Sequence, residues 1–206
     1  MTSPSFDARL DRLLQAAARV FARKGYHATT MRELARVSGM SLAGMYHYVS
    51  GKEELLYQIQ RGFFDRVLRG ARRALDGATD PVAALQAFVH HHVAFFAEHM
   101  NEMKVLSHEA ESLTGARDAE VRGLKRRYVD LLADTLAAAG SADPRTSAYA
   151  VFGMMNWMYT WYRPGGRLAA GQLADAFVQL ALHGVLGAPG RPARAAHRRT
   201  PARSGA

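Results

Sequence analysis

The sequence contains no cysteine. This absence excludes disulfide bonds, thiolate catalysis, and every zinc or iron–sulfur site that depends on sulfur ligands. A glycine-rich phosphate loop is missing too, and no Ser-His-Asp or paired-carboxylate arrangement stands in a supporting context. The sequence therefore does not predict an enzyme, and we expect neither a metal nor a cofactor.

Long apolar runs are also scarce. The uncharged stretch from Tyr149 to Tyr162 is shorter than the roughly 20 apolar residues that cross a bilayer, and it contains Asn156. The first five residues, MTSPS, lack the basic patch and apolar run of a secretory signal. We therefore expect a soluble, cytoplasmic protein with no membrane partner.

Acidic residues are fewer than basic ones, which gives a formal net charge of +9. Five of these charges are arginines of residues 188–206, a segment without any acid, so the rest of the chain carries +4. Residues 188–206 also lack an apolar period, and we expect them to form a disordered basic tail. The mildly basic body permits a polyanionic partner without requiring one.

Apolar residues recur with helical spacing through most of the chain, and no run alternates as a strand would. We predict an all-α fold of about nine helices. The first is expected from about Asp7 to Lys24, with Gly25 as its stop. The last two are expected at 144–162 and 171–186. Helix starts are marked by side chains that can cap a first turn: Thr30, Ser41, Ser50, Asp80 and Asp143.

Residues 30–49 contain two short predicted helices separated by Gly39-Met40-Ser41, which is the spacing of a helix-turn-helix. Gly39 can adopt the positive φ that such a turn needs. Met45 and Val49 lie four residues apart and can face the core. The alternative is a generic three-helix module whose aromatic residues pack internally.

The stretch from Gly25 to Leu56, GYHATTMRELARVSGMSLAGMYHYVSGKEELL, resembles the DNA-binding signature of the TetR family of bacterial transcriptional regulators. The resemblance implies a helix-turn-helix domain over residues 1–52 and a helical ligand-binding and dimerisation domain over residues 53–187. It also implies a homodimeric repressor that binds a palindromic operator in double-stranded DNA and is released by a small apolar effector.

Carried over position by position, the resemblance gives two sets of DNA-binding candidates. Phosphate contacts are expected from Thr29, Thr30, Tyr46, Tyr48 and Lys52. Contacts to base edges or to a thymine methyl are expected from the start of the recognition helix and its neighbour, namely Arg32, Ser41, Leu42, Ala43, Gly44 and His47.

The segment from Asn156 to Leu168, NWMYTWYRPGGRL, resembles part of a TetR subgroup that senses acyl-CoA thioesters and controls fatty-acid or sterol degradation. This second resemblance implies an acyl chain between the helices and a CoA phosphate near Arg163 or Arg167. On an unbroken helix, Asn156, Thr160 and Arg163 would share one face. The ligand-binding candidates are Phe96, Met100, Met103, Tyr128, Asn156, Trp157, Thr160, Trp161 and Arg163.

Several alternatives remain open at this point. The aromatic and methionine residues are also typical of plain core. Glu98, Glu102, Glu109 and Glu111 are typical of a solvated face, although an acid among aromatic residues would favour a cationic drug as effector of an efflux or metabolic operon. An architectural DNA-binding protein is a further alternative. His90, His91 and His92 suggest a metal site, but consecutive residues diverge on a helix, so a solvated or core-edge cluster is favoured.

Dimerisation is expected from small and apolar residues of the last two helices: Ala148, Gly153, Ala174, Phe177, Leu180, Ala181, Gly184 and Val185.

Overall fold

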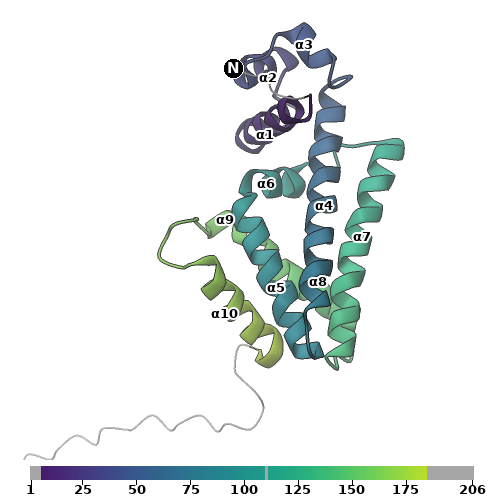
Figure 1. Ribbon diagram of the computed structural model, residues 1–206, viewed down its shortest axis with the longest axis vertical. Coiled ribbons are helices and arrows are strands. Elements are labelled where there is room, and N and C mark those ends of the chain that lie inside the picture. Colours follow the sequence, from purple (N-terminus) through teal and green to yellow (C-terminus); the bar gives the residue numbers. More distant parts are fainter. Residues whose placement is uncertain (1–5, 110, 185–206) are drawn as a thin grey trace, which may run out of the picture.

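The computed structural model describes residues 6–109 and 111–184, and in these ranges it contains helices and no strand (Figure 1). The all-α prediction is confirmed. The expected basic tail and Val185 lie outside the described residues. The helices are α1 (Phe6–Lys24), α2 (Met31–Ser38), α3 (Leu42–Tyr46), α4 (Lys52–Asp76), α5 (Pro81–Glu98), α6 (Met100–His108), α7 (Gly115–Ala138), α8 (Pro144–Asn156), α9 (Met158–Trp161) and α10 (Ala170–His183).

Helices α1 to α3 gather at one end of the molecule, and α4 runs from them into the larger bundle (Figure 1). The small module has its own apolar centre, formed by side chains at most 3% exposed: Leu13, Phe21, Leu34, Met45, Val49 and Leu56. Burial of such side chains stabilises each by about 1.5–3 kcal/mol relative to exposure. The module is joined to the bundle by α4 and by the packing of α1 against α6.

Most of the predicted caps are confirmed. The hydroxyls of Thr30 and Ser41 accept the N–H groups of Glu33 and Gly44, and the carboxylate of Asp80 accepts two N–H groups of α5. Asp143 caps α8 in the same way. These bonds satisfy donors that the first turn of a helix leaves unpaired.

Thr30 with Glu33, and Ser50 with Glu53, have the spacing of a capping box, in which the two side chains bond to the backbone of the first turn. At Ser50 the box is wrong by one residue. Gly51 is the N-cap of α4, and Glu54 accepts the hydrogen bond from the Ser50 N–H at 2.6 Å as well as that from its hydroxyl. At Thr30 the box is half formed, because the Glu33 carboxylate binds Lys24 Nζ at 2.6 Å. The helix starts are nevertheless near their predicted positions.

The helix expected from Pro144 to Tyr162 is interrupted at Trp157. The carbonyl of Trp157 accepts both the N–H and the hydroxyl of Thr160, at 3.1 and 2.8 Å, which tightens the turn to a three-residue spacing. The chain becomes extended at Tyr162, where ψ is 140°, shortly before Pro164. This interruption is why about nine predicted helices appear as the ten labels of Figure 1.

Helices α4 and α5 approach closely at Gly70. A Cβ at this position would lie 2.2 Å from Cε1 of His91, so only glycine leaves room for the imidazole. Nε2 of His91 lies 3.0 Å from the Val67 carbonyl and binds it. The C-terminal half of α4 is therefore held against α5. Among the described helices, none has both the length and the apolarity needed to cross a bilayer.

Candidate functional site

The turn between α2 and α3 has the helix-turn-helix geometry that the sequence predicts. Gly39 adopts a left-handed conformation with φ 70°, and the N–H of Met40 binds the Ala35 carbonyl at 3.0 Å. Met45 and Val49 are 0% and 3% exposed, as expected for the inner face of α3. The outer face of this short helix is left to solvent.

On that outer face, Ala43, Tyr46 and His47 are exposed, and the Tyr46 ring is 53% exposed. Gly44 is half-buried, and Leu42 is half-buried with its side chain against the core, so the expectation that Leu42 points outward is corrected. Of the neighbouring candidates, those exposed to solvent are Thr30, Arg32 and Ser41. Exposed aromatic area on a short capped helix is typical of a surface that a partner covers.

Two of the expected phosphate contacts have other roles in the structure. Thr29 is 2% exposed, and its hydroxyl donates to the Gly25 carbonyl at 2.7 Å, so the buried side chain is not presented to a phosphate. Lys52 Nζ donates to the carbonyls of Tyr26, Thr29 and His27 at 2.8, 3.0 and 3.3 Å. The ammonium also lies 4.4 Å from the centre of the Tyr26 ring. These contacts hold the loop that leads into α2.

A groove separates α3 from the start of α1. Its lining includes Arg9 and Arg12 on one side and Ser41 and His47 on the other. Tyr48 is half-buried and stacks on Phe6 with ring centres 4.5 Å apart, which fixes α1 beside α3. Sequence reasoning missed both arginines, because exposed cations on an amphipathic helix give no signal of what lies opposite them. They add positive charge beside the recognition helix.

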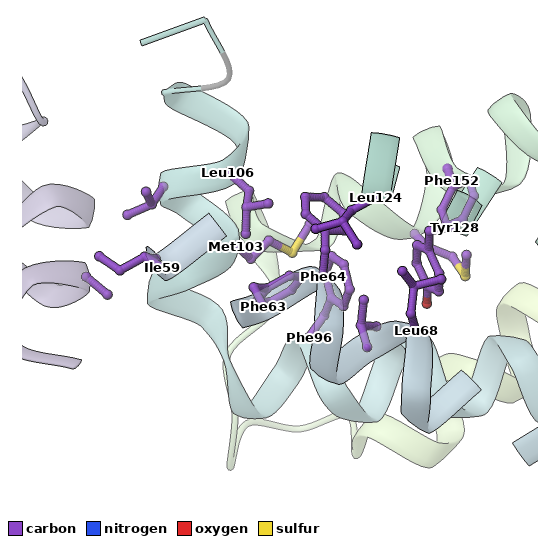
Figure 2. Close-up of a cluster of buried hydrophobic side chains, with 14 of the residues drawn as sticks. Ile59, Phe63, Phe64, Leu68, Phe96, Met103, Leu106, Leu124, Tyr128 and Phe152 are labelled. Atoms are coloured by element: carbon purple, nitrogen blue, oxygen red, sulfur yellow. The ribbon is translucent and has the colours of Figure 1, made fainter. Parts of the chain in front are cut away.

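A second candidate site is a cavity of about 450 Å³ inside the bundle. Figure 2 shows part of its apolar wall, where Phe63 and Phe64 of α4 lie near Phe96 of α5 and Met103 of α6. The wall is completed by residues from α6, α7 and α8: Leu106, Ser107, Lys125, Tyr128, Val129, Tyr149, Phe152 and Asn156. The structure thus brings together Phe96, Met103, Tyr128 and Asn156 of the predicted ligand-binding set.

The cavity wall also holds a buried polar group that sequence reasoning missed. His92 is 0% exposed, and its Nδ1 lies 3.1 Å from the hydroxyl of Tyr128. Burial, followed by the neighbouring His91, lowers the pKa of His92 to about 3, so the ring is neutral near pH 7. His90 and His91 bind Asp175 of α10 and Val67 of α4 instead, which confirms that the three histidines diverge.

The cavity meets a cluster of cations on α7. Lys125, Val129 and Tyr149 line both the cavity and an adjoining surface depression, which Arg122 and Arg126 flank. Arg122 is paired with Asp118, whereas Lys125 and Arg126 have no ion pair among the described residues. Burial is the largest cause that lowers the pKa of Lys125. We call Arg122, Lys125 and Arg126 the basic mouth.

Comparison with known proteins identifies the architecture. Residues 13–59 match the family described as bacterial regulatory proteins, tetR family, and residues 78–185 match the tetracyclin repressor-like, C-terminal domain. The chain belongs to the TetR family. The resemblance seen in residues 25–56 is thereby confirmed.

Relatives within the TetR family are regulators of transcription. The repressor KstR2 of Mycolicibacterium smegmatis is 31% identical over 191 residues, covering 86% of this chain and 91% of that protein. The crystal structure of AibR in complex with isovaleryl coenzyme A and operator DNA has a TM-score of 0.76 at 31% identity, covering 84% of this chain and 97% of AibR. PfmR from Thermus thermophilus gives a TM-score of 0.79 at 31% identity, with 85% and 99% covered. This TetR-family chain is a transcriptional regulator, and the prediction that it is not an enzyme is confirmed.

The remaining ligand-binding candidates of this TetR-family chain lie outside the cavity. Trp157 and Trp161 are 61% and 46% exposed, and Thr160 and Arg163 are exposed as well. Because the helix is interrupted at Trp157, Asn156 and Arg163 do not share the helical face that the sequence predicts. Met100 is half-buried and does not line the cavity either.

The predicted dimerisation residues also need correction. Ala148, Ala174 and Phe177 are 0%, 1% and 6% exposed inside one protomer, so they have no surface to offer a second copy. Gly153, Gly184 and Leu180 are exposed, and Ala181 is half-buried. Of the predicted residues that the structure describes, these four keep exposed surface on α8, on α10 and at its end.

Proposed function

We propose that this TetR-family regulator binds a palindromic operator as a homodimer and that an acyl-CoA relieves the binding. The α3 face with Ala43, Tyr46 and His47 supports the DNA part of the proposal, because a short exposed helix can enter the major groove. Two such helices must be about 34–36 Å apart to reach successive grooves, which requires a dimer. As a DNA-binding regulator the protein would act in the cytoplasm.

One observation carries the acyl-CoA part: an apolar cavity opens beside cations, two of which have no ion pair within the described part of the chain. The side chains of Phe63, Phe96 and Met103 suit an acyl chain, since rings and thioethers adapt to flexible apolar groups. The basic mouth would hold the phosphates of the CoA, and its Arg126 and Lys125 have no competing ion pair among the described residues. AibR, with its complex of isovaleryl coenzyme A and operator DNA, supports the same assignment.

The second copy would cover an aromatic face at the end of α8. Gly153 and Trp157 lie four residues apart and are exposed, and Trp161 of α9 is exposed beyond them. Large exposed aromatic side chains are enriched at protein interfaces. Arg163 and Arg167, which the sequence places near a CoA phosphate, lie in the segment after α9, and neither lines the cavity of one protomer. Their contact with a CoA phosphate would therefore depend on the second copy.

A cationic drug is the second candidate effector, and the structure favours it less. None of the four glutamates that suggested it lines the apolar cavity. Glu98 and Glu102 line a polar cleft beside α1, Glu109 is buried against Tyr26, and Glu111 is exposed. The charged group nearest to the ligand would be Lys125, which repels a cation.

The proposed function can be tested with operator DNA selected from a random duplex library. Fluorescence anisotropy would measure DNA release by isovaleryl-CoA and octanoyl-CoA, with free CoA and a hydrophobic cation as comparisons. We expect release by an acyl-CoA and none by free CoA. Release by the cation alone would overturn the effector assignment, and failure to select any duplex at low salt would overturn the DNA-binding assignment.

A further inference from the structure

Two buried polar atoms in the cavity wall lack hydrogen-bond partners. Nε2 of His92, on α5, and Oδ1 of Asn156, at the end of α8, are both inaccessible to solvent and form no hydrogen bond within the described residues. A side-chain hydrogen-bonding interaction from His92 to Asn156 opposes the lowering of the His92 pKa, yet neither atom meets the geometry of a well-formed hydrogen bond, so the two groups lie side by side and pair poorly. Both side chains line the apolar cavity. An unpaired buried polar atom is destabilising, so a ligand that pairs with both atoms gains from doing so.

The hydrogen-bond roles of the two atoms follow from Tyr128. The buried hydroxyl of Tyr128 has one proton to donate, and its partner is Nδ1 of His92 at 3.1 Å. In the tautomer in which Nδ1 accepts the Tyr128 proton, the neutral ring carries its own proton on Nε2. Nε2–H is therefore a donor, and the carbonyl oxygen of Asn156 is an acceptor. The cavity wall presents one of each.

We infer that the cavity recognises a hydroxyl group on the apolar part of its ligand, which accepts from His92 Nε2–H and donates to Asn156 Oδ1. A hydroxyl is the smallest organic group that can do both at once. If the ligand is the acyl-CoA of the proposed function, the inference names its class: a hydroxylated acyl chain. His92 and Asn156 are then the residues that set specificity.

Other polar groups match the pair less well. A ketone accepts from Nε2–H but leaves Oδ1 of Asn156 unpaired. A carboxylate would place a charge among Phe64, Phe96 and Leu106, while the cation that lines the cavity, Lys125, belongs to the basic mouth. A buried water, or a direct hydrogen bond from Nε2–H to Oδ1 after a small rotation of either side chain, would also satisfy both atoms, and in either case a ligand hydroxyl would bring no advantage.

Binding of matched acyl-CoAs by calorimetry tests the inference. The set comprises octanoyl-CoA with its 3-hydroxy, 3-oxo and 8-hydroxy derivatives. We expect at least one hydroxylated ester to bind about tenfold more tightly than octanoyl-CoA, and the 3-oxo ester to gain less. Equal affinity of all four esters would overturn the inference, because both atoms would then be satisfied without the ligand.

Variants identify the residues responsible. Asn156→Leu removes the acceptor at similar size, and His92→Phe removes the donor; each should abolish the preference, measured as the ratio between the affinities for the hydroxylated ester and for octanoyl-CoA, whatever its effect on the affinity for octanoyl-CoA itself. Ser107→Ala is the matched control, because Ser107 also lines the cavity with a hydroxyl but is exposed. A preference that survives in Asn156→Leu, or disappears in Ser107→Ala, contradicts the assignment.

A pair of neutral ligands without CoA separates this inference from the proposed function. The isomers 1-octanol and 1-methoxyheptane differ in whether the oxygen can donate. Greater thermal stabilisation of the wild type by 1-octanol, lost in Asn156→Leu, would support the inference even if no acyl-CoA binds. If acyl-CoAs bind and neither series shows a preference for the hydroxyl, the proposed function stands and this inference falls; if no ligand binds at all, both fall.

Discussion

Glu109 Oε1 accepts the backbone N–H of Tyr26 at 2.9 Å, and the other carboxylate oxygen accepts the hydroxyl of Ser112 at 2.8 Å. Glu109 lies just after α6 and is 8% exposed. Met103 and Leu106 of the same helix line the cavity. Helix α6 therefore contacts both the cavity and the loop between α1 and α2, which Lys52 holds from the other side.

Replacing Glu109 should weaken this connection. In Glu109→Ala the buried N–H of Tyr26 loses its partner, and we expect the free energy of unfolding to fall by about 1–3 kcal/mol. Acyl-CoA should still bind but release less DNA. Urea denaturation and anisotropy measure the two effects. Glu111→Ala, at an exposed neighbouring position, should change the unfolding free energy by less than about 0.5 kcal/mol. A Glu109→Ala protein with unchanged stability and full release would contradict the role of this contact.

Lys52→Met should act on stability rather than on phosphate binding. The variant loses three hydrogen bonds to loop carbonyls, and we expect a loss of about 1–2 kcal/mol in a thermal or urea denaturation, reduced by partial exposure. The salt dependence of operator binding should stay unchanged. A slope of log K against log salt that falls by about 0.9 per lost contact would instead identify Lys52 as a phosphate contact.

Tyr46→Phe should weaken operator binding and leave the stability of the protein unchanged. The ring is 53% exposed, so removal of the hydroxyl should change the unfolding free energy by less than about 0.5 kcal/mol. Operator affinity should fall about fivefold if the hydroxyl binds DNA, which corresponds to about 1 kcal/mol. Anisotropy titration measures this change. Wild-type affinity in Tyr46→Phe would exclude a contribution from the hydroxyl.

Lys125→Met should separate ligand binding from stability. Burial lowers the pKa of Lys125 in the folded protein, so folding disfavours its charged form. The resulting loss of stability grows as the pH falls from the pKa of the unfolded chain toward that of the folded protein, and it is present at pH 7. The variant should therefore melt at a higher temperature while binding acyl-CoA about tenfold more weakly at low salt. Arg127→Met, at an exposed position of α7 outside the cavity, is the charge-matched control. Equal loss in both variants would point to general electrostatic attraction.

The buried imidazole of His92 should make stability depend on pH. With a folded pKa of about 3 and an ordinary unfolded value near 6.5, the unfolded chain binds the extra proton between these limits. Stability should therefore fall as the pH decreases from about 6.5 to 3, with a slope that approaches about 1.4 kcal/mol per pH unit for this group. Neighbouring His91, whose pKa is also lowered by burial, adds to the slope. His92→Gln should flatten the measured curve, and His47→Gln, at an exposed position, should leave it unchanged.

Local signals predicted the DNA-binding module well. Gly25 and Gly39 end their helices with φ of 90° and 70°, and the Thr30 and Ser41 caps form as expected, because each depends on neighbours within four residues. The roles of Thr29 and Lys52 depend on carbonyls of the folded loop. A motif carried over by position does not contain that information.

The cavity was predicted less completely because its members are distant in sequence. Phe96, Met103, Tyr128 and Asn156 were expected from their residue types, whereas Lys125 looks like any other cation on a charged helix. The group from Trp157 to Arg163 was misplaced because no glycine or proline marks the interruption at Trp157. There the hydroxyl of Thr160 competes for a backbone carbonyl, which a helical period does not reveal.

The contact of Gly70 with His91 limits how α4 can move. At this point α4 is held against α5, so a tilt of α4 about residue 70 would move its start, about 30 Å away at 1.5 Å per residue, against the hydrogen bonds that Tyr57 and Arg61 make with Glu120 of α7. A rotation of about 4° would then displace the start of α4 by about 2 Å. A small shift of α4 around a bound ligand would thus become a larger shift at the start of the helix. The position of Gly70 along α4 sets the ratio of the two shifts.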